Sequence, residues 1–585
     1  MINRLLLTTN AYFYKVKKPI SKAAISNMLT TSSASKDGNA LYKEIREPLN
    51  VNGENFLVSL IVFRRLASPT FLTPGRETET HHCYLFLVEY DHFLIVSKQG
   101  TDPFIYIIEK RIDNLNYKEV TGLKVTPTTQ FVKIGVSNMD TTPNAMRRVV
   151  YEAQDVKNNL SALSTSNKII TSLKLKNKGK NTSVAPNTSR LNDLGKRENV
   201  NFFCYWVAVQ CKAIGTFTPK TTYLNNFAEP LDFKTHITGL KVKSLLFNFA
   251  SILEGLEDGT IAGIYFLDKN SRSRDIDLKL LSETHDFCLD VEYVKASKTF
   301  PIINKIDNSL SLRQLTEGFA IHSGKLDRVN IQFTNGENIS LLHLINRDNL
   351  YIVSFNNADI RFSNKTLFRD TRLLANLPYF LDSFETHPSF VSITSEKGKP
   401  APKSKKFDST SLFGAIENNL SSDCSFLFCD DLGNEWADYI GFLENGFIRF
   451  YHAKFSKLGF SASAFQEVIA QALKNLGNFN FNQKLDAKKR KITEKYPGSN
   501  IARFRKGTTT NAFIKELTAT YNFPQTEKEV VIVVNFMSKK ELEKQLKLLA
   551  KGNAKNEAVQ VLWLISAFFS ECLQRGIKPR VITRP

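Results

Sequence analysis

Asp431-Leu-Gly-Asn-Glu435-Trp-Ala-Asp438-Tyr-Ile-Gly-Phe442 is followed closely by Gly446-Phe-Ile-Arg-Phe-Tyr-His452-Ala-Lys454, and these two stretches carry the most specific pattern in the chain. Their apolar runs predict two neighbouring strands. Acidic residues gather where the first strand begins, and Lys454 ends the second. Because the strands form a hairpin, we expect Asp438 and Lys454 at the same open end of the sheet. Carboxylates beside a lysine suit a site that binds a divalent metal and hydrolyses a phosphodiester.

The flanking residues predict the order of elements around this hairpin. Apolar residues at helical spacing indicate helices at 412–420, 461–478 and 556–574. β-branched and aromatic runs indicate strands at 425–429 and 530–534. With the hairpin, these segments give the order helix, three strands, helix, strand, helix.

This order and its motifs resemble the PD-(D/E)XK restriction-endonuclease-like nucleases, and more closely the C-terminal nuclease domains of bacterial phage-defence proteins. Those domains carry Asp-Asp-Gly-x-Gly-Glu-x-Ala-Asp and then His-Cys-Lys. The matching residues here are Asp430-Asp-Leu-Gly-Asn-Glu-Trp-Ala-Asp438 and His452-Ala-Lys454. The resemblance covers residues 408–585. It implies a metal-dependent nuclease of an antiviral or restriction-like defence system, with Mg²⁺ or Mn²⁺ as cofactor and DNA as the expected substrate.

The resemblance implies roles for individual residues in this motif. Glu435 and Asp438 are the expected metal ligands, and Lys454 is expected to orient the attacking water and offset developing charge. His452 stands where the family name requires Asp or Glu. It is either a third metal ligand or general base, or a packed histidine in a degraded site.

Three further polar residues have two interpretations each. Gln471, on the helix after the hairpin, is either a catalytic residue that reaches the site or a polar residue at the border of the apolar stripe. Asp431 is either a ligand or, as we slightly favour, a turn residue at a strand end. Glu417 can join a metal site in similar folds, but we favour a solvated helix face.

A basic stretch follows the helix at 461–478. We expect nucleic-acid contacts from Lys488, Lys489, Arg490, Lys491, Arg503, Arg505 and Lys506. Clusters of this kind bind phosphates without reading sequence, and the interspersed Tyr496, Phe504 and Phe513 could stack on unpaired bases. The alternative is a solvated loop with no ligand.

Composition divides the chain into five segments. Residues 1–152 predict a β-rich domain, and 153–200 a basic, low-complexity linker or loop. Residues 201–394 predict a mixed α/β domain, and 395–407 a second linker that contains proline and lysine. Residues 408–585 form the nuclease-like α/β domain. The expected fold class is therefore α+β multidomain, with β-rich regions before the nuclease-like domain.

Charge and cysteine usage limit the class of protein. The chain has 585 residues and a formal charge of +21, which favours a polyanionic partner. Its seven cysteines are scattered without a Cys-x-x-Cys pair, which favours a reducing compartment. No apolar run is long enough for a signal peptide core or a membrane span. We therefore expect a cytoplasmic protein without membrane attachment.

The resemblance leaves two functions and two assembly states open. The main hypothesis is an active nuclease, acting as a homodimer or together with a partner protein of the same defence system. The alternative is a catalytically inactive scaffold that binds nucleic acid or senses a signal within a defence complex. The departure at His452 is the main support for that alternative.

Overall fold

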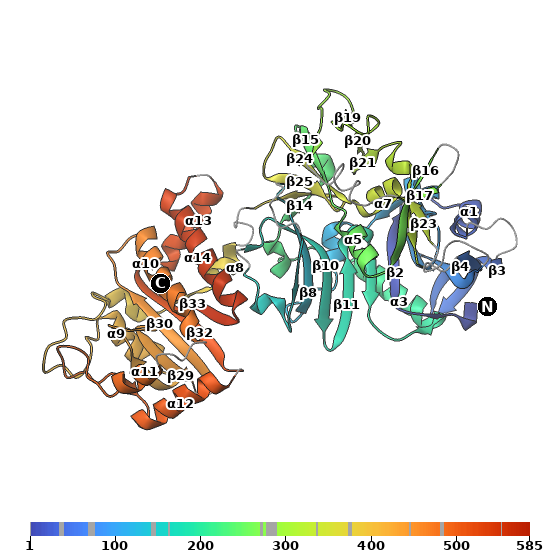
Figure 1. Cartoon of the computed structure of the whole chain (residues 1–585). Helices are drawn as coiled ribbons and strands as arrows, with labels where there is room; N and C mark the ends of the chain where they lie inside the picture. The colour runs from blue at the N-terminus through green and yellow to red at the C-terminus, as the bar shows by residue number, and fades with distance from the viewer. Residues whose placement is uncertain are drawn as a thin grey trace. The chain divides into compact units, whose positions relative to one another are not determined.

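Figure 1 shows the computed structural model of the chain. It describes residues 2–33, 40–67, 77–141, 148–161, 164–268, 273–275, 289–334, 337–371, 377–443, 446–479, 485–523, 525–551 and 553–585. The N-terminal unit comprises Met1–Val156 and Asn167–Thr371, and the C-terminal unit comprises Lys157–Ser166 and Arg372–Pro585. Both units mix helices with strands, and the strands form several sheets. This confirms the α+β class at the level of secondary structure.

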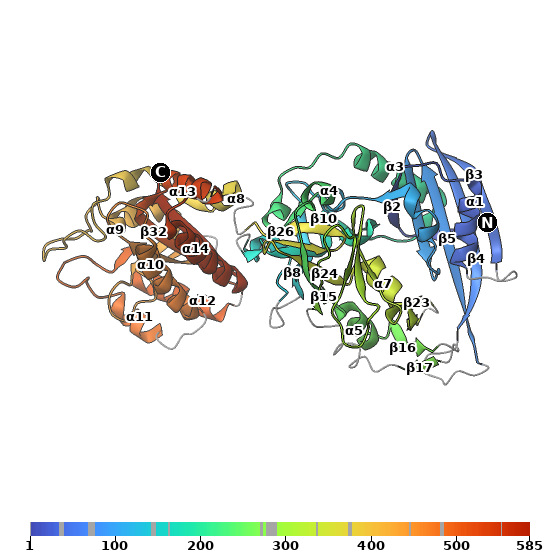
Figure 2. The same ribbon diagram turned by 90° about the horizontal axis from the view of Figure 1, so that it is seen from above.

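The N-terminal unit is built on a large sheet. Its strands are β2 (Asn10–Val16), β3 (Ala40–Val51), β4 (Glu54–Ala67), β5 (Glu79–Tyr90), β6 (Phe93–Gln99), β7 (Ile112–Asn114), β8 (Gln130–Asn138), β9 (Arg148–Glu152), β10 (Lys168–Asn177), β11 (Lys180–Ala185) and β12 (Arg190–Asp193). They lie in the order β3-β4-β5-β6-β2-β12-β11-β10-β8-β9, and β7 pairs with β2. Strands β8, β10 and β11 are labelled in Figure 1, and β3, β4 and β5 in Figure 2. Helix α3 (Val200–Gly215) packs on one face, where Trp206 lies edge-on to Phe13.

The predicted linker at 153–200 is wrong. Strands β10, β11 and β12 come from this segment and pair in the middle of the large sheet. In β10, Leu173 and Leu175 are buried, while Lys174 and Lys176 alternate with them toward solvent. The high lysine and asparagine content therefore hid a strand period of two.

Smaller sheets and helices complete the N-terminal unit. The helices besides α3 are α1 (Lys22–Ser32), α2 (Tyr117–Gly122), α4 (Phe233–His236), α5 (Ala250–Glu257) and α7 (Leu341–Asp348). The remaining strands are β1 (Leu6–Leu7), β13 (Glu198–Asn199), β14 (Glu229–Leu231), β15 (Val242–Phe247), β16 (Ile261–Leu267), β17 (Ser273–Asp275), β18 (Leu289–Asp290), β19 (Thr299–Pro301), β20 (Ser311–Leu315), β21 (Gly318–His322), β22 (Val329–Phe333), β23 (Asn338–Ser340), β24 (Tyr351–Phe355), β25 (Ile360–Ser363) and β26 (Thr366–Arg369). Leu344 and Ile345 of α7 pack in one core with Val353 of β24.

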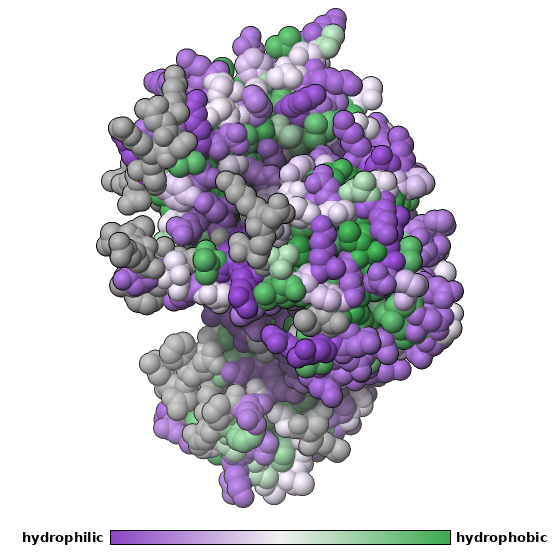
Figure 3. All heavy atoms as spheres, turned by 90° about the vertical axis from the view of Figure 1, so that its right-hand side faces the viewer, coloured by the Kyte–Doolittle hydropathy of each residue, from purple (hydrophilic) through white to green (hydrophobic). Residues whose placement is uncertain are grey.

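Apolar side chains are also exposed on the surface. Hydrophilic side chains cover much of the face in Figure 3, with hydrophobic ones in patches between them. Helix α3 exposes Phe202, Tyr205 and Val209 by 46, 47 and 44%. None of the described helices combines the length and the apolar character that a membrane-spanning segment needs.

A seven-stranded sheet forms the centre of the C-terminal unit. Its strands are β27 (Phe384–Thr386), β28 (Cys424–Cys429), β29 (Tyr439–Leu443), β30 (Phe447–Lys454), β31 (Phe504–Lys506), β32 (Glu527–Ser538) and β33 (Ile577–Arg584). They lie in the order β27-β33-β32-β30-β29-β28-β31. β28, β29 and β30 pair antiparallel, whereas β30, β32 and β33 pair parallel.

Two cores cover the two faces of this sheet. The helices are α8 (Leu377–Asp382), α9 (Leu412–Ala415), α10 (Ala462–Asn475), α11 (Leu485–Lys491), α12 (Thr510–Asn522), α13 (Lys539–Ala550) and α14 (Asn556–Gln574), and a π-helical turn (Ile416–Leu420) extends α9. Phe450 of β30 packs with residues of α10 and α14, while its neighbour Tyr451 packs with α9. This alternation follows from the strand period of two.

The predicted order of elements in the C-terminal unit is confirmed. Helix α9, the three antiparallel strands, α10, β32 and α14 follow one another as the sequence indicates. Elements α11, β31 and α12 lie between α10 and β32, and β33 follows α14; none of these was predicted.

The second predicted linker, 395–407, is also wrong. Ser395 forms a parallel bridge with Ser411, and Phe413 N–H donates to the carbonyl of Glu396 at 2.9 Å. Phe407 is 5% exposed and packs edge-on against Phe413. The two ends of the segment are therefore attached to the α9 region within the C-terminal unit, while the residues between them are half-buried or exposed. Its lysines and prolines resemble a linker, but the phenylalanine at its end anchors it.

Candidate metal site in the C-terminal unit

Three carboxylates meet in the loop between β28 and β29. Asp431, Glu435 and Asp438 each offer one carboxylate oxygen, and these oxygens lie within 4.8 Å of one another. Asp431 and Asp438 are buried, and Glu435 is half-buried. We call these three residues the acidic group. Hard oxygen ligands at this spacing fit a divalent cation such as Mg²⁺ or Mn²⁺.

A tight backbone turn folds the loop back on itself. Leu432 (φ 69°) and Gly433 (φ 75°) both adopt the left-handed conformation, which is uncommon for leucine. Leu432 N–H donates to Oε2 of Glu435 at 3.0 Å. The turn thus holds the Glu435 carboxylate close to the loop backbone, and backbone strain of this kind concentrates at functional sites.

The neighbouring strand β30 positions Asp438. Its N–H donates to the carbonyl of Tyr451 at 2.9 Å, and its Oδ2 accepts the N–H of Ala453 at 2.6 Å. The hairpin predicted from the sequence is therefore what places this carboxylate. Ala453 precedes Lys454, so the Asp438 carboxylate contacts the strand backbone next to that lysine.

The carboxylates of the acidic group repel one another. Burial raises the pKa of Asp438 well above its usual range, and the charges of Asp431 and Glu396 raise it further. The hydrogen bond from Ala453 and the charge of Lys397 oppose this rise in pKa. Crowded, buried carboxylates favour either a shared proton or a bound cation. A divalent cation would relieve the repulsion, which supports the fit of a metal.

Two residues beside the acidic group come from the segment predicted to be a linker. Lys397 Nζ lies 2.8 Å from Oδ2 of Asp431, which also accepts a hydrogen bond from the Tyr496 hydroxyl at 2.7 Å. Glu396 Oε2 accepts the N–H of Phe455, the residue after β30, at 3.1 Å. Sequence reasoning missed Glu396 and Lys397, because no local pattern connects them with a loop more than thirty residues later.

A buried ion pair between Asp430 and residues of α11 stabilises the loop between β28 and β29. Asp430 is fully buried, and its Oδ2 accepts the N–H of Trp436 at 2.7 Å. Lys488 forms an ion pair with the same carboxylate, and Lys491 Nζ lies 3.0 Å from its other oxygen. Burial lowers the pKa of Lys488 to about 8, although Asp430 raises it. Both lysines also donate to backbone carbonyls of the loop.

Lys454 and Gln471 lie on the α10 side of the hairpin end. Lys454 forms an ion pair with Glu467 of α10, and its side chain is 23% exposed. Gln471 is half-buried and lies one turn after Glu467 on the same helix. The expected pairing of Lys454 with the acidic group is thus replaced by an ion pair with α10. Lys397 is the lysine in contact with a carboxylate of the group.

His452 does not join the acidic group. It is 2% exposed, and its Nε2 has no hydrogen-bond partner in the part of the chain that the structure describes. Burial lowers its pKa to about 3, with a smaller contribution from the charge of Lys474. The interpretation as a third ligand is therefore corrected to that of a neutral, packed histidine. Strand alternation puts its side chain on the Phe450 face.

The outcomes for the two remaining acidic residues differ. Asp431, for which we favoured a turn role, directly precedes the tight turn at Leu432, and its carboxylate also belongs to the acidic group. Glu417, expected on a solvated face, forms an ion pair with Arg505 whose Nε–Oε1 distance is 2.5 Å. It also accepts the Tyr439 hydroxyl at 2.9 Å, so it is a structural residue.

Most of the predicted nucleic-acid contacts hold the protein together instead. Lys488 and Arg503 are 1% and 3% exposed, so the prediction is wrong for these two residues. Arg503 donates to the carbonyls of Cys429 and Asp431, and Lys506 to those of Ser421 and Ser422. Lys491 and Arg505 pair with Asp430 and Glu417, as described above. Lys489 pairs with exposed Asp486, and Arg490 is exposed.

The aromatic residues of the basic stretch serve the core. Tyr496 is 6% exposed and Phe513 is 1% exposed, so neither offers a free ring for base stacking. Phe504 is partly buried against the core that contains Phe513. The interpretation of these rings as base-stacking residues is therefore corrected.

Comparison with known proteins finds no relative of this chain. No family model, no curated protein and no solved structure matches the chain. The functional argument therefore rests on the residues themselves.

Proposed function

We propose that the C-terminal unit is a metal-dependent nuclease that hydrolyses phosphodiester bonds, with DNA as the expected substrate. The observation that carries the proposal is the acidic group, in which Asp431, Glu435 and Asp438 bring carboxylate oxygens within 4.8 Å of one another. Its place at the end of a hairpin, in an element order that the resemblance implies, supports the proposal. Mg²⁺ or Mn²⁺ is the proposed cofactor.

The residues in and around the acidic group would have different roles in hydrolysis. Asp431, Glu435 and Asp438 would hold the cation. When bound, the cation supplies an activated water and neutralises phosphoryl charge. Lys397 is placed to offset charge on the substrate, because its ammonium already lies 2.8 Å from Asp431 Oδ2. Lys454 could contribute in the same way once released from Glu467.

Cleavage assays with the full chain test this proposal. Supercoiled plasmid, single-stranded DNA and RNA are incubated with Mg²⁺, with Mn²⁺ or with EDTA. We expect cleavage that requires metal and falls at least about 100-fold in Asp438→Asn, because a ligand is weakened. Asp486→Asn is the matched control, since Asp486 is 90% exposed in its ion pair with Lys489. Equal cleavage by Asp438→Asn and the unmodified protein would refute the proposed site.

One observation favours the second candidate, a nucleic-acid-binding scaffold without catalysis. His452 is buried and neutral, and Lys454 is paired with Glu467, so neither contacts the acidic group. A scaffold would bind DNA equally well in the unmodified protein and in Asp438→Asn, and would cut in neither. The proposed setting, an antiviral or restriction-like defence system with a homodimer or a partner protein, rests on the sequence resemblance alone. Adding the partner to an inactive preparation tests that part.

A further inference from the structure

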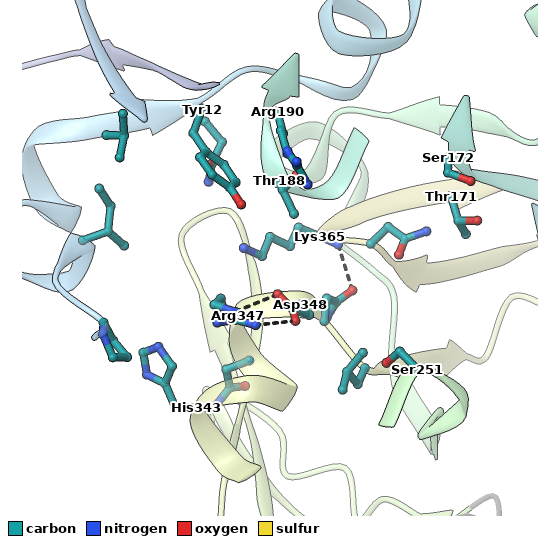
Figure 4. Close-up of a pocket in the computed structure, with 18 of the residues that line it drawn as sticks. Tyr12, Thr171, Ser172, Thr188, Arg190, Ser251, His343, Arg347, Asp348 and Lys365 are labelled. Atoms are coloured by element: carbon teal, nitrogen blue, oxygen red, sulfur yellow. Dashed lines mark hydrogen bonds and ion pairs between the residues drawn. The ribbon is translucent and has the colours of Figure 1, made fainter. Parts of the chain in front are cut away.

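The N-terminal unit contains a large pocket far from the acidic group in sequence. Its volume is about 980 Å³, at the upper end of the range for small-molecule sites. The large sheet forms one wall through β2, β6, β10 and β12, and α7 with the turn after β25 forms another. Figure 4 shows Tyr12 and Arg190 on the sheet facing Arg347 and Lys365. One water molecule occupies about 30 Å³ in the liquid. The pocket is therefore much larger than a small anion such as phosphate would fill.

The charges in the pocket are unevenly compensated. Its charged lining residues are the cations Lys98, Arg148, Arg190, Arg347 and Lys365 and the carboxylates Glu109, Glu337 and Asp348. Arg347 takes two of the carboxylates: its Nε lies 2.9 Å from Asp348, and its Nη1 lies 3.5 Å from Glu337. Arg148 pairs with Glu254 at 2.8 Å. Lys98, Arg190 and Lys365 have no ion-pair partner in the described ranges.

The walls of the pocket perturb two of these cations. Burial lowers the pKa of Lys98, partly opposed by the charges of Glu337 and Asp348, and lowers the pKa of Lys365, partly opposed by the charges of Asp348 and Glu109. By solvent accessibility Lys98 is half-buried and Lys365 is exposed, so both side chains can be reached from the open side of the pocket. The Lys98 ammonium lies 5.8 Å from the ring centroid of Phe104. Cations that face one pocket without a counter-ion favour a bound anion.

Polar groups in the walls also lack partners. Thr101 Oγ1, Ser137 Oγ, Thr171 Oγ1 and Asn364 Nδ2 are buried atoms without a hydrogen-bond partner among the described residues, and all four residues line the pocket. Thr101 and Ser137 are 1% and 6% exposed. A buried, unpaired polar group costs about 1–3 kcal/mol. Groups like these are suited to a ligand that carries several hydrogen-bonding atoms besides its charge.

We propose that this pocket binds a nucleotide. Lys98, Arg190 and Lys365 would hold the phosphate groups. The unpaired hydroxyl and amide groups would bind the sugar and the base, and Tyr12, which points into the pocket in Figure 4, offers a ring for the base. The volume admits a whole nucleotide rather than phosphate alone. This site is independent of the proposed nuclease, because every lining residue belongs to the N-terminal unit.

Calorimetric titration of the full chain tests the proposal. ATP, AMP, ribose 5-phosphate, adenosine and inorganic phosphate are the probes, and EDTA is present so that the acidic group holds no metal. We expect saturable binding of ATP or AMP that is stronger than binding of ribose 5-phosphate, adenosine or phosphate. Lys365→Ala and Arg190→Ala should each weaken it at least about tenfold, because each removes a charged hydrogen bond.

Lys176→Ala is the matched control. Lys176 is exposed on β10 outside the pocket, and its substitution should leave nucleotide affinity unchanged. Equal melting temperatures would show that the variants fold. The proposal fails if no nucleotide binds, if phosphate or ribose 5-phosphate binds as tightly as the nucleotides, or if both pocket variants bind like the unmodified protein.

Discussion

The two units use basic residues in opposite ways. In the C-terminal unit, Lys488, Lys491 and Arg503 bind the acidic loop and leave little of their charge exposed. In the N-terminal unit, Lys98 and Lys365 line a pocket with no ion-pair partner among the described residues. The dense basic stretch is thus mostly structural. The lysines without an ion-pair partner are instead isolated in the sequence and line the pocket of the N-terminal unit. Local charge density in a sequence does not identify an anion-binding surface until the partners of each charge are known.

The largest expected effect tests the structural half of this comparison. Lys488→Met removes a buried partner of Asp430, and we expect the free energy of unfolding to fall by about 3 kcal/mol. Urea denaturation measures this change. Lys489→Met, at a partly exposed position, is the control and should change stability by less than about 0.5 kcal/mol. If Lys488→Met is as stable as this control, the basic stretch does not support the loop.

A second test compares the two lysines near the acidic group. Lys397→Ala should lower the cleavage rate about 10- to 100-fold, because Lys397 is the cation in contact with Asp431. Lys454→Ala should lower it less, since Lys454 pairs with Glu467. Cleavage rates at saturating Mg²⁺ measure the difference. The reverse order would show that Lys454 leaves Glu467 and reaches the substrate.

These residues also show what the sequence can and cannot predict. The hairpin places Asp438 through contacts between adjacent strands, so local strand patterns were enough to predict its position. Lys397 and Lys488 reach the loop from segments far away in the chain, and their composition is that of solvated segments. The sequence left two interpretations of His452 open, because motif spacing fixes the face of a strand but not the depth of burial.

The buried state of His452 has a consequence for stability at acid pH. Its pKa is about 3 in the folded protein, against an ordinary value of 6.5. The unfolded chain therefore binds a proton between these values and the folded chain does not, so stability falls as the pH drops from 6.5 to 3. The slope is about 1.4 kcal/mol per pH unit. The raised pKa of Asp438 acts in the opposite direction, so only a variant isolates the histidine.

His452→Leu isolates it. Between pH 6 and pH 4, the free energy of unfolding of this variant should fall less steeply with decreasing pH than that of the unmodified protein. The difference in slope should be about 1.4 kcal/mol per pH unit, which corresponds to one proton. Urea denaturation at each pH measures it. His92→Leu is the control, because the His92 side chain is 87% exposed. An unchanged slope in His452→Leu would mean that His452 becomes protonated in the folded protein.

The smallest effect, a fraction of a proton, distinguishes the two proposed sites by its sign. Mn²⁺ binding to the acidic group requires ionised carboxylates, and the pKa of Asp438 is raised, so binding should release protons. A nucleotide in the pocket should instead take up protons at pH 8.5, because its phosphate raises the lowered pKa values of Lys98 and Lys365. Calorimetry in two buffers of different ionisation enthalpy measures both exchanges. Asp438→Asn should remove the first exchange and keep the second, whereas Lys365→Ala should reduce the second, since Lys98 remains, and keep the first. Proton exchange of the same sign for both ligands would contradict the assignment of opposite charge to the two sites.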